Sequence, residues 1–108
     1  MNIGTCAFAA VVASLPAVAA AQSGDPVRGK EISAVCAACH GPEGRSASAD
    51  FPVLAGQHEG YLYRALLDYK LENRKNPIMA AQVANLSRTD MRDLAAWFSL
   101  QDGLYLKR

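Results

Sequence analysis

The feature that most constrains this chain is the motif Cys36-Ala-Ala-Cys39-His40 in the first half of the sequence. On a helix, residues three and four positions apart lie on one face, so both thiols and the imidazole project together. Cys-x-x-Cys-His is the pattern by which a haem is attached covalently, with the histidine binding its iron. We therefore expect one haem c, with its iron, held by Cys36 and Cys39 and ligated by His40.

Three alternatives compete with haem attachment. A thioredoxin-like redox pair also uses Cys-x-x-Cys, but it requires a βαβ context, and no strand-like run precedes this motif. A structural zinc site needs four ligands, for which Cys36, Cys39, His40 and His58 are candidates, although no second paired motif exists. A chance match is the third alternative. The motif, together with the secretory signal described below for residues 1–21, favours haem attachment over these alternatives.

The second axial position of the iron has three candidate ligands in the rest of the chain, His58, Met79 and Met91. Met91 falls on the apolar face of a predicted helix and fits core packing, whereas His58 fits a solvated position before a helix. Met79 lies in an irregular stretch, residues 76–79, that Pro77 stiffens. We therefore expect Met79 to be the second ligand. Met/His ligation raises the reduction potential and closes the iron to other ligands.

The N-terminal segment differs from the rest of the chain. Residues 1–21 carry no charged side chain and end in overlapping Ala-x-Ala sites, which predicts a secretory signal peptide cleaved after Ala21. Cys6 would be discarded with it. A retained transmembrane anchor is the alternative, but Pro16 and the run of alanines make it weakly hydrophobic. We expect export to a bacterial periplasm and no stable membrane insertion after cleavage.

Cleavage would leave a single domain over residues 22–108, which is 108 − 21 = 87 residues. A core this small is marginal and commonly needs a covalent staple or a bound group. A disulfide between Cys36 and Cys39 would close too small a loop to restrain the chain. All eleven Lys and Arg residues and all ten Asp and Glu residues lie in this domain. That balance argues against binding to nucleic acid.

The hydrophobic pattern predicts helices only. We expect three main helices over residues 26–39, 59–74 and 87–101, joined by a loop over residues 41–56 and another around Pro77.

Local signals support these helix starts. Asp25 before Pro26 is an N-cap followed by proline at the first helical position, and Ser87 with Asp90 forms a capping box. Gly29 lowers helix propensity by roughly 1 kcal/mol, which makes sense if another element packs closely against it.

Several segments taken together are similar to a known family. They are Gly29, Cys36-Ala-Ala-Cys39-His40-Gly41, Phe51-Pro52-Val53-Leu54-Ala55-Gly56-Gln57, Tyr61-Leu62, Arg74, Pro77-Ile78-Met79 and Asp93-Leu94-Ala95-Ala96-Trp97-Phe98. Over about residues 24–101 the chain resembles a class I c-type cytochrome, and especially one haem domain of the periplasmic diheme cytochromes. It departs from them in having one haem motif and in having Trp97 where the family more often has Tyr.

The resemblance implies a small class I cytochrome c fold around one covalently bound haem, with Gly29 packed against Trp97 where the first helix crosses the last. It implies that the carbonyl of Pro52 accepts the Nδ1 proton of His40. It also implies that Leu54 packs on the ring and that Arg74 lies near a haem propionate. A helix C-terminal charge is the alternative role for Arg74.

The expected function is electron transport by a monohaem cytochrome c between periplasmic redox partners, an oxidoreductase, oxidase or reductase. The protein would be a monomer or a small subunit, and not an enzyme in its own right. The alternative is a small electron-transfer subunit of a larger periplasmic dehydrogenase, for which residues 104–108 are an interaction segment or a frayed end. Ligand sensing or peroxidase catalysis needs an open iron position, against which Met79 argues.

Overall fold

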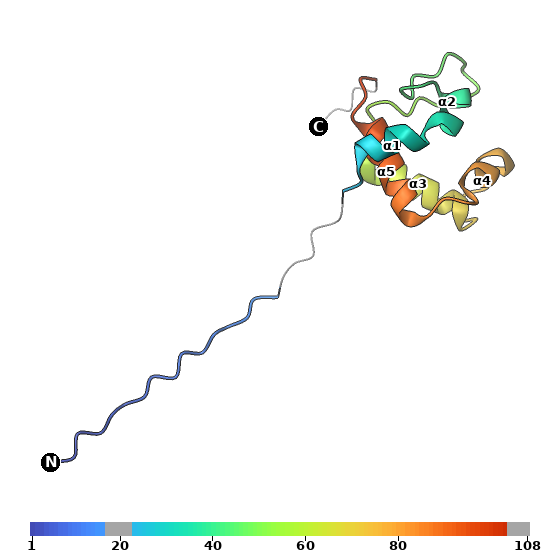
Figure 1. Cartoon of the computed structure of the whole chain (residues 1–108). Coiled ribbons are helices and arrows are strands. Elements are labelled where there is room, and N and C mark those ends of the chain that lie inside the picture. Colours follow the sequence, from blue (N-terminus) through green and yellow to red (C-terminus); the bar gives the residue numbers. More distant parts are fainter. Residues whose placement is uncertain (17–22, 104–108) are drawn as a thin grey trace.

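The computed structural model describes residues 1–16 and 23–103, so the predicted cleavage point at Ala21 and the segment 104–108 lie outside these ranges. Residues 1–16 form neither helix nor strand and extend away from the folded domain (Figure 1). Within the described ranges, no helix is both long and apolar enough to cross a membrane.

The described part of the domain contains helices and no strands. The helices are α1 (Pro26–Ile32), α2 (Ala34–His40), α3 (Glu59–Lys70), α4 (Pro77–Val83) and α5 (Arg88–Ser99). The predicted all-α class is therefore confirmed. The structure differs in two respects: the first predicted helix is divided into α1 and α2, and α4 forms where a loop was expected.

Ser33 divides the first predicted helix. Its hydroxyl donates to the carbonyl oxygen of Lys30 at 2.7 Å, and its backbone N–H bonds to the same oxygen at 3.3 Å. A serine that bonds back to the preceding turn competes with the regular helical hydrogen bonds and bends the helix. The start of α1 is as predicted, because the side chain of Asp25 accepts from the backbone N–H groups of Val27 and Arg28.

The core lies between α5 and α3. Leu62 of α3 packs with three residues of α5, namely Leu94, Ala95 and Phe98. The predicted capping box starts α5: the N–H of Asp90 donates to Ser87 Oγ at 3.0 Å, and the N–H of Ser87 donates to Asp90 Oδ2 at 2.9 Å. The capped start thus holds the main apolar face in place.

α3 ends at Lys70, four residues before its predicted end. The backbone of Glu72 adopts a left-handed conformation, with φ of 62°, and reverses the chain. The N–H of Arg74 then returns to the carbonyl of Asp68 at 3.1 Å. This turn places the start of α4 beside the end of α3 (Figure 1).

Gly29 brings the backbones of α1 and α5 into contact. A Cβ atom at this position would lie 2.0 Å from the carbonyl oxygen of Asp93 and 3.0 Å from the Cβ of Trp97. The close packing predicted for Gly29 is confirmed, and Trp97 is the neighbour that the resemblance implied.

Arg28 reinforces this crossing. Its guanidinium forms ion pairs of 2.6 Å with Asp90 and 2.7 Å with Asp93. The Asp93 carboxylate is buried and also accepts the N–H of Asp25 at 2.7 Å. A buried carboxylate is tolerated because such partners compensate for its lost hydration. The sequence analysis missed this network, since its members lie 62 and 65 residues from Arg28.

The crossing gives a first prediction. Replacing Gly29 with Ala should lower the free energy of unfolding of the holoprotein by about 2 kcal/mol, because the added methyl group overpacks the helix contact. Gly60→Ala is the matched control: it is also helical, has no heavy atom within 4 Å of the new Cβ, and should gain about 0.5 kcal/mol. Urea unfolding measures both, and equal effects of the two substitutions would contradict the helix contact.

Candidate haem site

The short helix α2 carries the two thiols and the imidazole of the motif. Cys36 is half-buried against the core cluster and Cys39 is exposed, and no disulfide joins them. Burial raises the pKa of the Cys36 thiol above its ordinary value. The two thiols are thus unbridged by a disulfide, and they lie three residues apart on one helix.

His40, the last residue of α2, has a fixed orientation and tautomer. Its side chain is buried, and its Nδ1 lies 2.8 Å from the carbonyl oxygen of Pro52. A carbonyl can only accept, so Nδ1 carries a proton, and in the neutral imidazole the lone pair is on Nε2. The ring also packs edge to face with Phe51, at 6.3 Å between centroids. The imidazole is thus prepared to bind a metal through Nε2.

The loop that carries Pro52 is pinned to the core by backbone hydrogen bonds. The carbonyl of Gly44 accepts from Leu54 N–H at 2.8 Å and from Ala55 N–H at 3.2 Å. Two residues after Leu54, Gly56 N–H donates to the carbonyl of Phe98 in α5 at 3.1 Å. These bonds connect the His40 acceptor to the rigid helix α5.

Gly44 is required at this point by both conformation and space. Its φ is 79°, and a Cβ atom there would lie 2.8 Å from the Phe98 ring and 2.9 Å from the backbone nitrogen of Ala55. The sequence analysis expected a loop over residues 41–56 but did not assign this role to Gly44.

Met79 lies in the first turn of α4, and not in a loop as expected. The side chain of Asn76 caps this helix by accepting from the N–H groups of Ile78 and Met79, at 3.0 and 3.2 Å. Pro77 occupies the first helical position. Met79 is half-buried. In Figure 1, α4 and α2 lie on the same side of the α1–α5 pair.

The two other candidate ligands have different surroundings. Met91 is fully buried in the core, and His58 is an exposed residue at the start of α3. Within the described residues, no three His, Cys, Asp or Glu side chains gather closely enough to hold a metal ion. The zinc alternative therefore lacks its ligand cluster there, and the redox-pair alternative lacks its strands.

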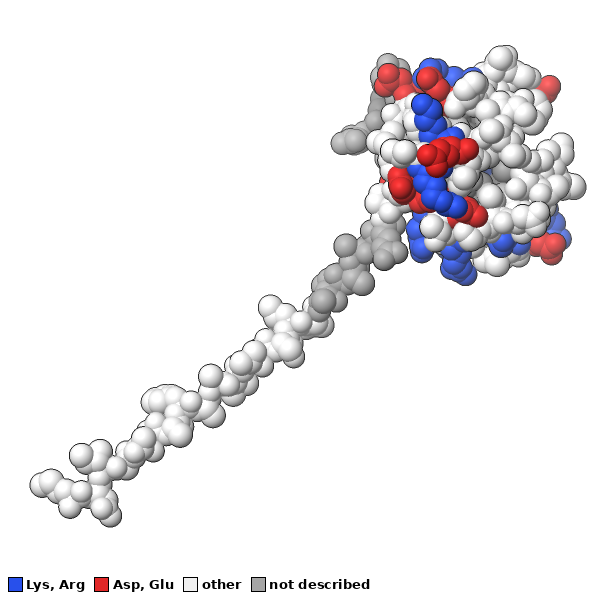
Figure 2. Space-filling model, in the orientation of Figure 1, with Lys and Arg blue, Asp and Glu red and all other residues white. Residues whose placement is uncertain are grey.

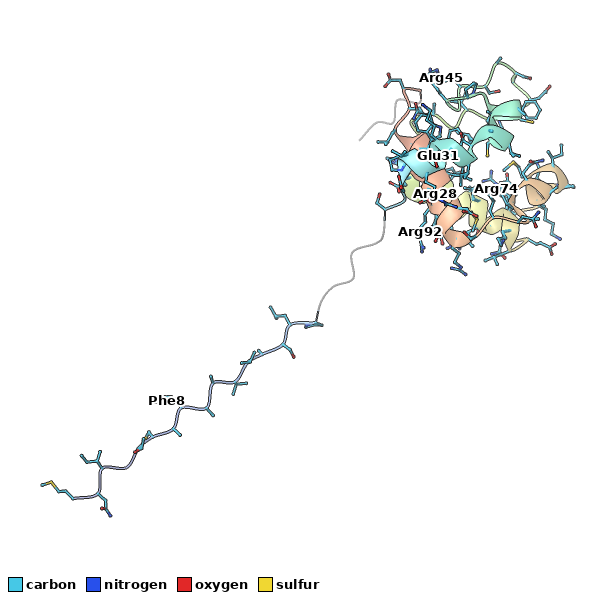
Figure 3. All side chains as sticks on the ribbon, in the orientation of Figure 1. Phe8, Arg28, Glu31, Arg45, Arg74 and Arg92 are labelled. Atoms are coloured by element: carbon cyan, nitrogen blue, oxygen red, sulfur yellow. The ribbon has the colours of Figure 1, made fainter. Side chains whose placement is uncertain are left out.

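Leu54 and Arg74 occupy different environments. Leu54 is half-buried and packs against the core cluster. Arg74, labelled in Figure 3, is exposed. Its guanidinium lies over the ring of Tyr69, 5.1 Å from the centroid. A hydrogen bond to the Tyr61 side chain is the main cause that raises the pKa of Arg74.

Comparison with known proteins settles the family. The family model described as cytochrome c matches residues 26–99. The chain belongs to the cytochrome c family. It is 42% identical over 88 residues to cytochrome c4 of Azotobacter vinelandii, covering 73% of this chain and 42% of that protein. It is 32% identical to cytochrome c-554(548) of Halomonas halodenitrificans, covering 74% of this chain and all of that protein.

A solved structure gives the same result. Reduced cytochrome c4 from Pseudomonas stutzeri superimposes with a TM-score of 0.73 at 41% identity, covering 76% of this chain and 48% of that one. The chain thus spans about half the length of its cytochrome c4 relatives. Other relatives include a thiosulfate dehydrogenase electron acceptor of Stutzerimonas stutzeri and the cytochrome subunit of sulfide dehydrogenase of Chlorobaculum tepidum.

Membership of the cytochrome c family implies a covalently bound haem c with its iron. The donor set of the described residues fits this group. Two unbridged thiols stand three residues apart, and an imidazole beside them has its Nε2 lone pair free for iron. Apart from this donor set, one buried side-chain atom among the described residues, Trp97 Nε1, has no hydrogen-bond partner.

The pinned loop gives a second prediction. Gly44→Ala should increase the rate of proteolytic cleavage within residues 41–58 about ten-fold, because the backbone bonds that hold this loop need the left-handed glycine. Limited proteolysis of the holoprotein, with cleavage sites assigned by mass spectrometry, measures this rate. Gly60→Ala is again the control. Unchanged cleavage in Gly44→Ala would show that the loop does not depend on this glycine.

Proposed function

We propose that this chain is a monohaem electron carrier whose haem is joined to Cys36 and Cys39 and whose iron lies between His40 and Met79. The observation that supports it most is the hydrogen bond from His40 Nδ1 to the carbonyl oxygen of Pro52, because it leaves Nε2 as the nitrogen that can bind iron. Bound haem iron supplies reversible one-electron chemistry by alternating between its ferric and ferrous states.

The residues of the chain adjust this chemistry in separate ways. The Pro52 carbonyl makes the imidazole of His40 a more basic ligand. The thioether of Met79 would raise the reduction potential of the iron and exclude other ligands from it. Leu54 would cover the ring with apolar surface, and Arg74, held by its tyrosine neighbours, would offset a propionate charge. Because both axial positions would be filled, the chain would transfer electrons without binding a substrate.

We propose redox proteins as the partners, met through small and transient contacts. On the face in Figure 2, acidic and basic side chains are interspersed, so neither sign forms a dominant field there. A small electron-transfer subunit of a dehydrogenase is the second candidate, supported by the relatives named for thiosulfate and sulfide dehydrogenases. Stable co-purification with a catalytic subunit from the native host favours the second candidate, and a free monomer favours the first.

The proposed ligation by Met79 can be tested by substitution. Met79→Ala should abolish the near-infrared sulfur–iron band of the ferric protein, lower its reduction potential, and allow cyanide or carbon monoxide to bind, because the thioether is lost. Met91→Leu is the matched control and should keep the band, since a volume-conserving core substitution has a cost below about 1.5 kcal/mol. A band that survives in Met79→Ala or disappears in Met91→Leu would assign the ligand elsewhere.

Export makes a separate prediction. When the full chain is expressed in a bacterium with haem-attachment machinery, the intact mass of the periplasmic protein should equal residues 22–108 plus one haem. Removal of residues 1–21 is expected because they end in small residues that suit signal cleavage. A haem-containing protein recovered from the membrane with residues 1–21 still attached would support the anchor alternative.

A further inference from the structure

Helix α4 is held to the domain by few contacts. It has seven residues, and Val83 is its one buried side chain. Among the described helices it packs mainly against α3, near the end of that helix (Figure 1). An isolated helix of this length is unstable in water, so its position depends on the groups that attach its two ends.

The N-terminal end of α4 is attached through the main chain. The N–H of Arg74 bonds to the Asp68 carbonyl at 3.1 Å, and Asn76 caps the first turn. These bonds attach this end to α3 without involving Lys70.

The C-terminal end of α4 is attached by the buried side chain of Val83, its last residue, and by one polar side chain from α3. The ammonium group of Lys70 donates to the carbonyl oxygen of Ala84 at 3.2 Å and also to that of Leu86. Ala84 is the C-cap of α4, and Leu86 lies in the short link to α5. A cation at this end of a helix satisfies unpaired carbonyl groups and interacts favourably with the helix dipole.

We expect the hydrogen bonds of Lys70 to affect the local opening of α4 more than the stability of the whole domain. Lys70 is exposed, and exposed charged contacts contribute little to the stability of a whole domain. They matter for partial opening, in which a lightly held element separates while the core stays folded. Without Lys70, α4 would keep its N-terminal attachment and lose the polar side-chain tether at its other end.

We propose that Lys70 is a positioning residue that holds α4 in place and so keeps the Met79 sulfur on the iron. The inference rests on the proposed ligation by Met79. Lys70 does not touch the cofactor in this account. It limits how often α4 opens and exposes the sixth position of the iron to other ligands.

The test measures imidazole binding to the ferric holoprotein. Lys70→Met removes the donor and the charge but keeps the aliphatic stem, and imidazole should then bind about five-fold faster, because opening no longer breaks two charge-assisted hydrogen bonds. Lys70→Arg, which can donate to both carbonyls, should restore a rate close to that of the unmodified protein.

Lys75→Met is the matched control. Lys75 is exposed, lies in the same turn region, and has no hydrogen bond or ion pair with the other residues that the structure describes. It changes the net charge equally, so it should leave the binding rate unchanged. Hydrogen exchange is a second readout: the backbone amides of residues 80–83 should exchange about five-fold faster in Lys70→Met alone.

The outcomes separate the two proposals. If the unmodified protein shows the sulfur–iron band but Lys70→Met behaves like Lys75→Met, the role of Lys70 is wrong and the ligation stands. Failure of Lys70→Arg to restore the rate would also overturn that role. If the unmodified protein lacks the band, the Met79 ligation itself is wrong, and the inference about Lys70 fails with it.

Discussion

The contact between α1 and α5 at Gly29 is the constraint on which the rest of the domain depends. It fixes the first helix against the helix that supplies most of the core, and the buried carboxylate of Asp93 joins the two through Arg28 and Asp25. α2 continues directly from α1 after the bend at Ser33, so the position of both thiols follows from this crossing. Two helices whose contacting residues Gly29 and Asp93 are 93 − 29 = 64 positions apart therefore set the geometry of a motif five residues long.

The local sequence predicted the features that depend on local chemistry. The all-α class and the caps at Asp25 and Ser87 were confirmed because each rests on the preferences of a few neighbouring residues. The close packing at Gly29 was confirmed because a glycine that lowers helix propensity indicated a close tertiary contact. The missed helix α4 was also readable: Asn76-Pro77 repeats the cap-and-proline pattern of Asp25-Pro26. The sequence analysis took Pro77 as a residue that stiffens an irregular stretch and did not weigh this signal.

Other features could not have been read from the sequence. The break at Ser33 depends on the choice of its hydroxyl between solvent and the Lys30 carbonyl, which the helical pattern does not decide. The ion pairs of Arg28 and the bonds from Lys70 to Ala84 and Leu86 join residues that only tertiary structure brings together. The motif identified the cofactor, but the contacts that position its ligands are visible only in the three-dimensional structure.

The pairing of the first helix with the last has a consequence for how the chain matures. During synthesis from the N-terminus, α1 lacks its main packing partner until residues 88–99 have been made, so the contact between α1 and α5 forms late. The fold of the domain is therefore completed only after its last helix has been synthesised.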